Sequence, residues 1–315
     1  MSASPSHRSP SPAVAPSTAP LIPGHAGPAG AAARPPTAPA PLTAGPAAGR
    51  DPGSAVAVAA RLRAAGCVFA EDEASLILAT ATTPADVAAM VDRRAAGLPL
   101  EHVLGWAEFR GLRVAVDPGV FVPRRRTEFL VDQAVTLTAP DAVILDLCCG
   151  SGALGVALAV TARRAELHAA DIDPAAVACA RRNVAAVAAR LAGPARVYEG
   201  DLYAPLPPTL RGRVDVLLAN APYVPTDAID LLPAEARLHE ARMAFDGGAD
   251  GLAVLRRVAA GAPLWLRAGG HLLFETSERQ ASQAVETVER AGLRARVATS
   301  DEYSATVVIA TRPPS

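Results

Sequence analysis

From about residue 142 onward, short apolar segments alternate with longer segments in which apolar side chains recur at helical spacing. The segments that predict strands are 142–147, 166–172, 196–199, 214–219 and 270–275, with a terminal hairpin of 293–299 and 306–310. Helical patterns lie between them at 174–191, 251–267 and 277–291. This alternation predicts an α/β fold with a doubly wound, mostly parallel sheet, whose ligands bind beyond the carboxyl ends of the strands.

The chain before this alternating region divides into three parts. Residues 1–52 hold 13 of the 29 prolines, no aromatic residue and a single acid. We expect this tail to be disordered, because it cannot bury enough apolar surface to offset its entropy; a transit peptide is the alternative. Residues 53–97 predict a small helical domain, in which Thr83 caps a helix that begins at Pro84 and stops at Gly97. Residues 98–122 predict a linker with a β-hairpin, followed by a larger domain over 123–315.

Composition and charge narrow the possible partners. Apolar residues make up 50% of the chain, which is enough for a sizeable core. The 31 acidic and 30 basic residues give a net charge of −1, whereas proteins that bind nucleic acid usually carry a basic excess. No apolar stretch is long enough to predict a membrane span, and the four cysteines form neither a CxxC pair nor a zinc pattern. We therefore expect a cytoplasmic protein with reduced thiols, no metal site, no membrane span and no direct contact with nucleic acid.

A glycine-rich segment follows the first predicted strand and opens a helix. It reads Asp146-Leu-Cys-Cys-Gly150-Ser-Gly152 and continues to Gly155 as G-x-G-x-x-G. Glycines let the backbone approach a ligand closely, and a helix N-terminus offers free N–H donors. Asp171 ends the second strand, where its carboxylate can accept hydrogen bonds from ribose hydroxyls. These features suit either a nicotinamide or flavin dinucleotide or S-adenosylmethionine.

The acid at the end of the first strand favours S-adenosylmethionine. The Asp146 carboxylate suits the methionine amino group, reached through the loop, whereas a dinucleotide offers no cation there. After the third strand, Asp201 can accept a hydrogen bond from adenine N6, and Leu202 can form an apolar wall for the ring. The expected cofactor-binding residues are Asp146, Cys148, Gly150, Gly152, Asp171, Ile172, Asp201, Leu202 and Asn220.

The fourth strand ends in Asn220-Ala221-Pro222-Tyr223, which we predict to be the catalytic segment. A planar amide or exocyclic amine attacks a methyl group poorly, because its nitrogen lone pair is delocalised. The Asn220 side-chain carbonyl and the Ala221 backbone carbonyl can accept both N–H groups and fix the nitrogen in line with the methyl donor. Pro222 biases Ala221 toward an extended conformation, and the Tyr223 ring can pack against a flat substrate. The alternative is an ordinary turn at the end of a strand.

With these motifs, residues 97–312 resemble the protein glutamine-N(5) methyltransferases, which modify a glutamine of release factors or of a ribosomal protein. The resemblance rests on 97–105 (GLPLEHVLG), 122–128, the glycine-rich segment, 171–174, 180–183, 220–223, 235–240, 247–252 and 272–276. It implies a seven-stranded Rossmann-like methyltransferase sheet behind a helical N-terminal domain. It also implies S-adenosylmethionine as cofactor and methyl transfer to a glutamine exposed on a protein partner.

Three departures mark a divergent branch of that family. Ala221 replaces the first proline of Asn-Pro-Pro-Tyr, Arg126 stands where the family has a glutamate, and Cys148 and Cys149 replace a Gly-Thr pair. The alternatives are an amino-methyltransferase of a nucleic-acid base or of a small molecule, an inactive cofactor-binding relative, and a nicotinamide oxidoreductase.

Two charged segments are open to more than one interpretation. Residues 124–126, three consecutive arginines, could bind an acidic group or lie in a solvated linker. His239 and Glu240 are expected to shape the loop after the catalytic strand, and not to form a metal or acid–base site.

Overall fold

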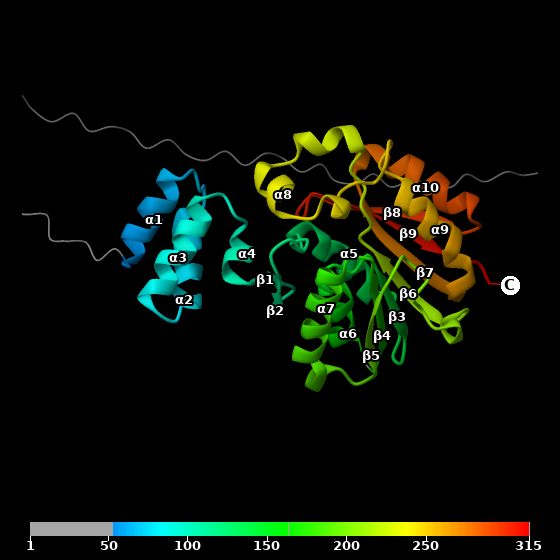
Figure 1. Ribbon diagram of the computed structural model, residues 1–315. Coiled ribbons are helices and arrows are strands. Elements are labelled where there is room, and N and C mark those ends of the chain that lie inside the picture. The colour runs from blue at the N-terminus through cyan, green and yellow to red at the C-terminus, as the bar shows by residue number, and fades with distance from the viewer. Residues whose placement is uncertain (1–52, 163, 315) are drawn as a thin grey trace, which may run out of the picture. The chain divides into compact units, whose positions relative to one another are not determined.

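The computed structural model describes residues 53–162 and 164–314, which fall within one compact unit. The expectation of disorder for residues 1–52 lies outside the described residues. The centre of this unit is a seven-stranded sheet in the order β5-β4-β3-β6-β7-β9-β8 (Figure 1). Its strands are β3 Val143–Leu147, β4 Glu166–Asp171, β5 Ala195–Glu199, β6 Val214–Ala219, β7 Leu266–Thr276, β8 Arg294–Ser300 and β9 Ala305–Thr311. Only β9 runs antiparallel to its neighbours β7 and β8, so the sheet is mixed but mostly parallel, as predicted.

Helices cover both faces of the sheet, because alternate residues of each central strand point to opposite sides. In β3, Leu145 belongs to a core shared with α9 Ala253–Trp265 and α10 Ala281–Arg290. Its neighbour Ile144 belongs to a second core, shared with α5 Glu128–Val135 and α6 Ala153–Thr161. Both residues are completely buried. The doubly wound α/β architecture is therefore confirmed.

The order of the connections leaves a crevice at the carboxyl ends of the central strands. The chain runs outward from β3 to β4 and β5, then returns to place β6 on the other side of β3. Helices α6 and α7, Pro174–Ala186, form the crossovers on the first side. Strand order reverses between β3 and β6, and open α/β sheets bind ligands at such a point. The glycine-rich segment, Asp171 and Asn220 all follow the carboxyl ends of strands at this crevice.

The N-terminal part contains α1 Ala55–Ala64, α2 Ala70–Thr80 and α3 Pro84–Ala95 around a separate apolar core. Thr83 caps α3 as predicted: its hydroxyl accepts from the Asp86 N–H, while the Asp86 carboxylate accepts from the Thr83 N–H. A short helix, α4 Leu100–Leu104, then leads into the hairpin of β1 Trp106–Phe109 and β2 Leu112–Ala115. The hairpin was expected and α4 was not. The proposed domain boundaries at 97 and 123 stay predictions.

Element bounds differ from the sequence prediction by one or two residues at several ends, and by more in three places. Strand β7 begins at Leu266, not at residue 270, because the sheet register shifts around Gly269 and Gly270 and the strand continues on both sides. The helix expected over 174–191 ends at Ala186, and the one expected from 277 begins at Ala281 after a 3₁₀ turn. No helix within the described ranges is long and apolar enough to cross a membrane.

Candidate active site

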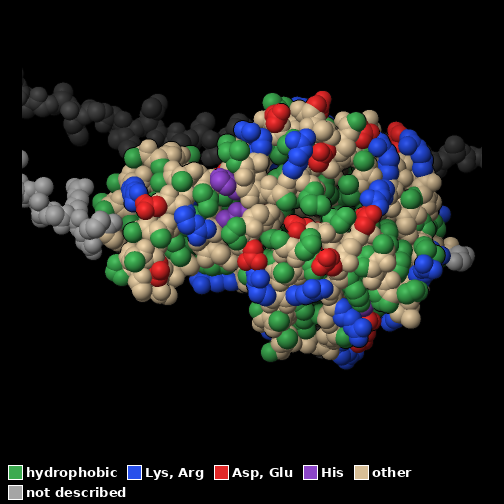
Figure 2. Space-filling view, in the orientation of Figure 1, with side chains coloured by type: hydrophobic (Ala, Val, Ile, Leu, Met, Phe, Trp, Pro, Cys, Tyr) green, Lys and Arg blue, Asp and Glu red, His purple; other side chains and the backbone are tan. Residues whose placement is uncertain are grey.

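A cavity of about 1180 Å³ opens at the carboxyl ends of β3, β4 and β6. Figure 2 shows a hollow on this face, with apolar side chains inside and charged side chains at its rim. The structure brings most of the predicted site residues together around the cavity. These are Cys148, Gly150, Asp171, Ile172, Asp201, Leu202, Asn220, Ala221, Pro222 and Tyr223. Asp146 and Gly152, which were also predicted to bind the cofactor, do not line it.

Residues 148–152, here called the cofactor loop, turn sharply and are held by Asp171. Gly150 has a φ of 55° and donates its N–H to Asp171 Oδ2 at 2.8 Å, while Asp171 Oδ1 accepts from the Asp173 N–H. Burial raises the pKa of Asp171. A Cβ at Gly150 would have no neighbour nearer than 4.0 Å, so the bare backbone leaves open space for a ligand at this point.

Asp146 lies beneath the cofactor loop and does not line the cavity, and its predicted interaction with the methionine amino group through the loop stays a prediction. Its Oδ2 accepts from the Gly155 N–H at 2.9 Å, and its Oδ1 has no hydrogen-bond partner within the described part of the chain. Complete burial raises the pKa of this carboxyl to about 7. A Cβ at Gly155 would approach Asp146 Oδ2 to 2.8 Å, so the last glycine of the motif makes room for Asp146.

Gly152 also acts in packing. It is the N-cap of α6 with a φ of 77°, and a Cβ there would lie 3.1 Å from the Ala180 Cβ of α7. The glycine therefore allows α6 and α7 to approach each other. It ends the cofactor loop but does not itself line the cavity. Its predicted direct contact with the cofactor does not follow from this placement.

The two cysteines of the cofactor loop occupy different positions. Both line the cavity, but Cys148 is partly exposed and has a φ of 55°, in the left-handed region that glycine favours, while Cys149 is buried. Burial and the nearby carboxylates raise the pKa of both thiols. Neutral thiols are poor nucleophiles, so both side chains act as small packing groups. The left-handed conformation at Cys148 carries a strain of about 1–2 kcal/mol that a glycine would avoid.

Asp201 and Leu202 lie together on the side of the cavity formed after β5. Asp201 Oδ2 accepts from Arg257 of α9 at 2.5 Å, and Arg257 also lines the cavity. The arginine orients a carboxylate that would otherwise rotate freely. Arg257 was not predicted from the sequence, because it lies 56 positions from Asp201 on a helix with no motif of its own.

The catalytic segment, residues 220–223, leaves β6 at the centre of the cavity. The Asn220 side chain and the Ala221 carbonyl form no hydrogen bond with any of the described residues, so both oxygens are available to a ligand. The Tyr223 hydroxyl, in contrast, donates to Glu275 Oε1 at 2.9 Å and accepts from Arg126 at 2.5 Å. Burial, followed by the charge of Glu275, raises the pKa of Tyr223.

Two of the three consecutive arginines are paired with buried carboxylates at the cavity wall. Arg126 Nε lies 2.8 Å from Glu275 Oε1, and Arg124 lies 2.5 Å from Glu240. Glu240 also accepts from the Val122 N–H, so it ties the loop after the catalytic strand to residues 122–124. Arg124 and Arg126 are therefore neither a free anion site nor part of a solvated linker, whereas Arg125 is exposed. Glu275 was missed, although its place at the carboxyl end of β7, next to β6, could have indicated it.

The segment 224–246, here called the roof segment, covers one side of the cavity. It contains α8 Ala234–His239 between two 3₁₀ turns, Thr226–Leu231 and Arg242–Ala244. Bridges join Val224 to Asp246 and Gly119 to Glu240, and the Phe245 ring meets Phe121 edge-on at 5.7 Å. The roof segment thereby adds apolar side chains to the cavity wall.

The fold and the cavity indicate one class of protein. Residues 111–259 match the family model of the methyltransferase small domain, and this range contains the cofactor loop and the catalytic segment. The open backbone at Gly150 suits the amino acid end of S-adenosylmethionine. The acceptors on Asp171 and Asp201 suit its ribose and its adenine, respectively. The protein is an S-adenosylmethionine-dependent methyltransferase.

Three curated relatives define the family. The chain is 42% identical over 204 residues to the release factor glutamine methyltransferase of Moorella thermoacetica. It is 40% identical over 205 residues to that of Mycolicibacterium smegmatis, and 37% over 203 residues to that of Geobacter sulfurreducens. The alignments cover 64% of this chain and 69%, 70% and 69% of the relatives, respectively. The chain belongs to the release factor glutamine methyltransferase family, and the resemblance noted in the sequence is confirmed.

Proposed function

We propose that the protein methylates the side-chain amide nitrogen of a glutamine in a peptide chain release factor. The observation that carries the proposal is the pair of free acceptors, the Asn220 side-chain oxygen and the Ala221 carbonyl, beside the cofactor loop. A primary amide has two N–H groups, and two acceptors can bind both. The relatives' activity on release factors supports this substrate, and release factors imply a cytoplasmic protein.

When bound, S-adenosylmethionine supplies an electrophilic methyl group on a sulfonium. Gly150 and the cofactor loop would hold its amino acid end, Asp171 its ribose and Asp201 with Leu202 its adenine. Ile172, whose side chain is half exposed at the cavity, would cover the ring from the other side.

The residues of the catalytic segment then act on the substrate amide. Asn220 and Ala221 accept its two N–H groups, which fixes the plane of the amide and points its nitrogen at the donor. With S-adenosylmethionine bound, the nitrogen would take the methyl group as the carbon–sulfur bond breaks, and the surplus N–H proton would leave to solvent. Because the acceptors are preorganised, they favour the developing positive charge on nitrogen without further rearrangement.

The test is Asn220→Ala with a release factor purified in unmethylated form. Loss of one preorganised hydrogen-bonding group typically lowers kcat about 10²–10³-fold. We expect this loss together with near-normal binding of S-adenosylmethionine, measured by calorimetry, and mass spectrometry should locate the wild-type product on a glutamine. Near-normal turnover by the variant would contradict the mechanism. Methyl label in RNA or DNA, and none in protein, would favour the amino-methyltransferase alternative.

A further inference from the structure

Tyr223, the last residue of the catalytic segment, is bonded at both ends. Its hydroxyl contacts Glu275 and Arg126, as described above. Its backbone carbonyl accepts a hydrogen bond of 3.0 Å from Nε2 of Gln280, which lies 57 positions further along the chain. The catalytic segment is therefore tied to the 3₁₀ turn Glu278–Gln280 that precedes α10.

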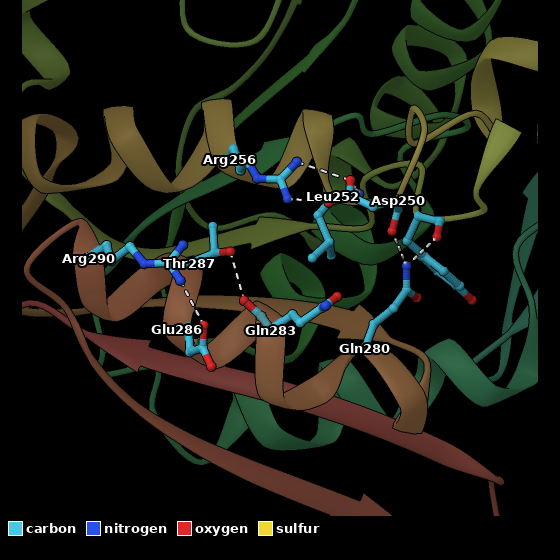
Figure 3. Close-up of polar contacts among 9 residues, drawn as sticks. Asp250, Leu252, Arg256, Gln280, Gln283, Glu286, Thr287 and Arg290 are labelled. Atoms are coloured by element: carbon cyan, nitrogen blue, oxygen red, sulfur yellow. Dashed lines mark hydrogen bonds and ion pairs between the residues drawn. The ribbon is translucent and has the colours of Figure 1, made fainter.

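The Gln280 amide uses each of its polar atoms in this contact. Nε2 donates a second hydrogen bond to the Asp250 carbonyl at 3.1 Å, and Oε1 accepts from the Ser277 hydroxyl at 2.6 Å. Figure 3 shows the amide nitrogen of Gln280 facing the loop that contains Asp250. Since the serine hydroxyl fixes the oxygen, the NH₂ group must face the two carbonyls. One side chain thus joins three segments that are distant in sequence.

Gly251 shows how closely these segments approach one another. It has a φ of 77°, and a Cβ at this position would come within 3.0 Å of both the Tyr223 carbonyl oxygen and Gln280 Nε2. The Tyr223 carbonyl belongs to the backbone, and the Gln280 amide is held by three hydrogen bonds. The loop, the catalytic segment and Gln280 are therefore packed without spare room.

We propose that Gln280 is a positioning residue for methyl transfer, an inference that rests on the proposed function. Because the two acceptors have no hydrogen bond of their own in the described structure, their positions depend on the backbone of the turn that carries them. Pro222 has a fixed φ and keeps Ala221 extended, so a carbonyl held at Tyr223 narrows the directions that the Ala221 carbonyl can take. Gln280 touches neither substrate nor cofactor in this proposal.

The test compares Gln280→Met with Gln283→Met. Methionine keeps the length of glutamine and removes its hydrogen bonds, and the exposed Gln283 side chain on α10 makes no hydrogen bond with the described residues. A displacement of about 1 Å can lower a rate about 10²-fold, so we expect kcat to fall about 10- to 100-fold in Gln280→Met. The KM for the release factor and the Kd for S-adenosylmethionine should stay within about twofold. Misorientation of the amide weakens the transition state and leaves the binding of both substrates unchanged. Gln283→Met should match the wild type.

A second measurement separates this inference from the proposed function. Hydrogen exchange of the Val224 and Gly247 amides, which are bonded across the roof segment, needs no substrate. We expect faster exchange in Gln280→Met than in the wild type and in Gln283→Met. If the wild type methylates no release factor, the proposed function fails, while the exchange result still decides whether Gln280 holds the catalytic segment in place.

Unchanged kcat and unchanged exchange in Gln280→Met would overturn the inference. Should that variant not fold, Ser277→Ala replaces it, because it removes only the bond that orients the amide. We expect a severalfold fall in kcat and faster exchange at the same amides. Wild-type values for both measurements in Ser277→Ala would equally overturn the assignment.

Discussion

Replacing Gly251 with alanine should destabilise the protein more than the same change at a glycine with similar backbone geometry. Gly251 has a φ of 77°, and its missing Cβ would overlap the Tyr223 carbonyl and the Gln280 amide. Left-handed backbone adds about 1–2 kcal/mol for a residue with a Cβ. Overpacking in a filled site adds about 1–3 kcal/mol. The sum predicts a loss of about 2–5 kcal/mol in the free energy of unfolding.

Gly292 provides the matched control. It follows α10 with a φ of 83°, and a Cβ there would meet nothing within 4 Å. Gly292→Ala should therefore show only the backbone contribution, about 1–2 kcal/mol. The difference between the two variants isolates the steric overlap at the catalytic segment.

Urea unfolding followed by circular dichroism gives both values from the shift in midpoint at constant slope. Methyl transfer by the folded fraction should fall in Gly251→Ala and not in Gly292→Ala, because only the first displaces Tyr223. Equal losses of stability in the two variants, with equal activity, would refute the reasoning that three segments meet at Gly251 without spare room.

Two further predictions concern buried groups under and in the cofactor loop. The folded pKa of Asp146 is about 7, above its ordinary value of 3.8, so the native state keeps a proton that the unfolded chain releases. Stability of the cofactor-free protein should therefore fall as pH rises from about 4 to 7, by up to about 1.4 kcal/mol per pH unit from this group. Asp146→Asn should remove that contribution, which urea midpoints of both proteins across the range would measure; parallel profiles would contradict it. Because burial raises the pKa of Cys148 and Cys149, iodoacetamide at pH 8 should alkylate both more slowly in the folded protein than in urea. Equal rates by mass spectrometry would show that these thiols are not shielded.

Much of the fold could be predicted from the sequence, because the central strands are buried on both faces and appear as short apolar runs. Each of the seven strands of the sheet was predicted, and the Thr83 cap was correct to the residue. The start of β7 was not, because Gly269 and Gly270 look like a boundary although they form an irregularity within one strand. The sequence pattern does not show whether residues before two such glycines belong to the same strand as the residues after them.

The site was predictable only where its residues directly follow strands. The cofactor loop, Asp171 and the catalytic segment meet because parallel strands end at one edge of the sheet. Three residues that contact this site were not predicted, because no local motif specifies them. Glu275 reaches it through the order of the strands, Arg257 from α9, and Gln280 from the turn before α10. Asp146 shows the opposite limit: its position beside the loop was correct, but the pleat directs its side chain beneath the loop.

The departures from the family motifs leave the proposed chemistry intact for separate physical reasons. At position 221 the mechanism uses a backbone carbonyl, which alanine provides as well as proline does. At position 126 arginine replaces an acid, and its guanidinium pairs with the buried Glu275 while donating to the Tyr223 hydroxyl. A glutamate there would instead place a second carboxylate beside Glu275, so the charge reversal is compensated within the site. Arg126 bonds the hydroxyl of Tyr223, and Gln280 bonds its carbonyl. A different residue at position 126 therefore leaves the contact between Gln280 and the catalytic segment in place.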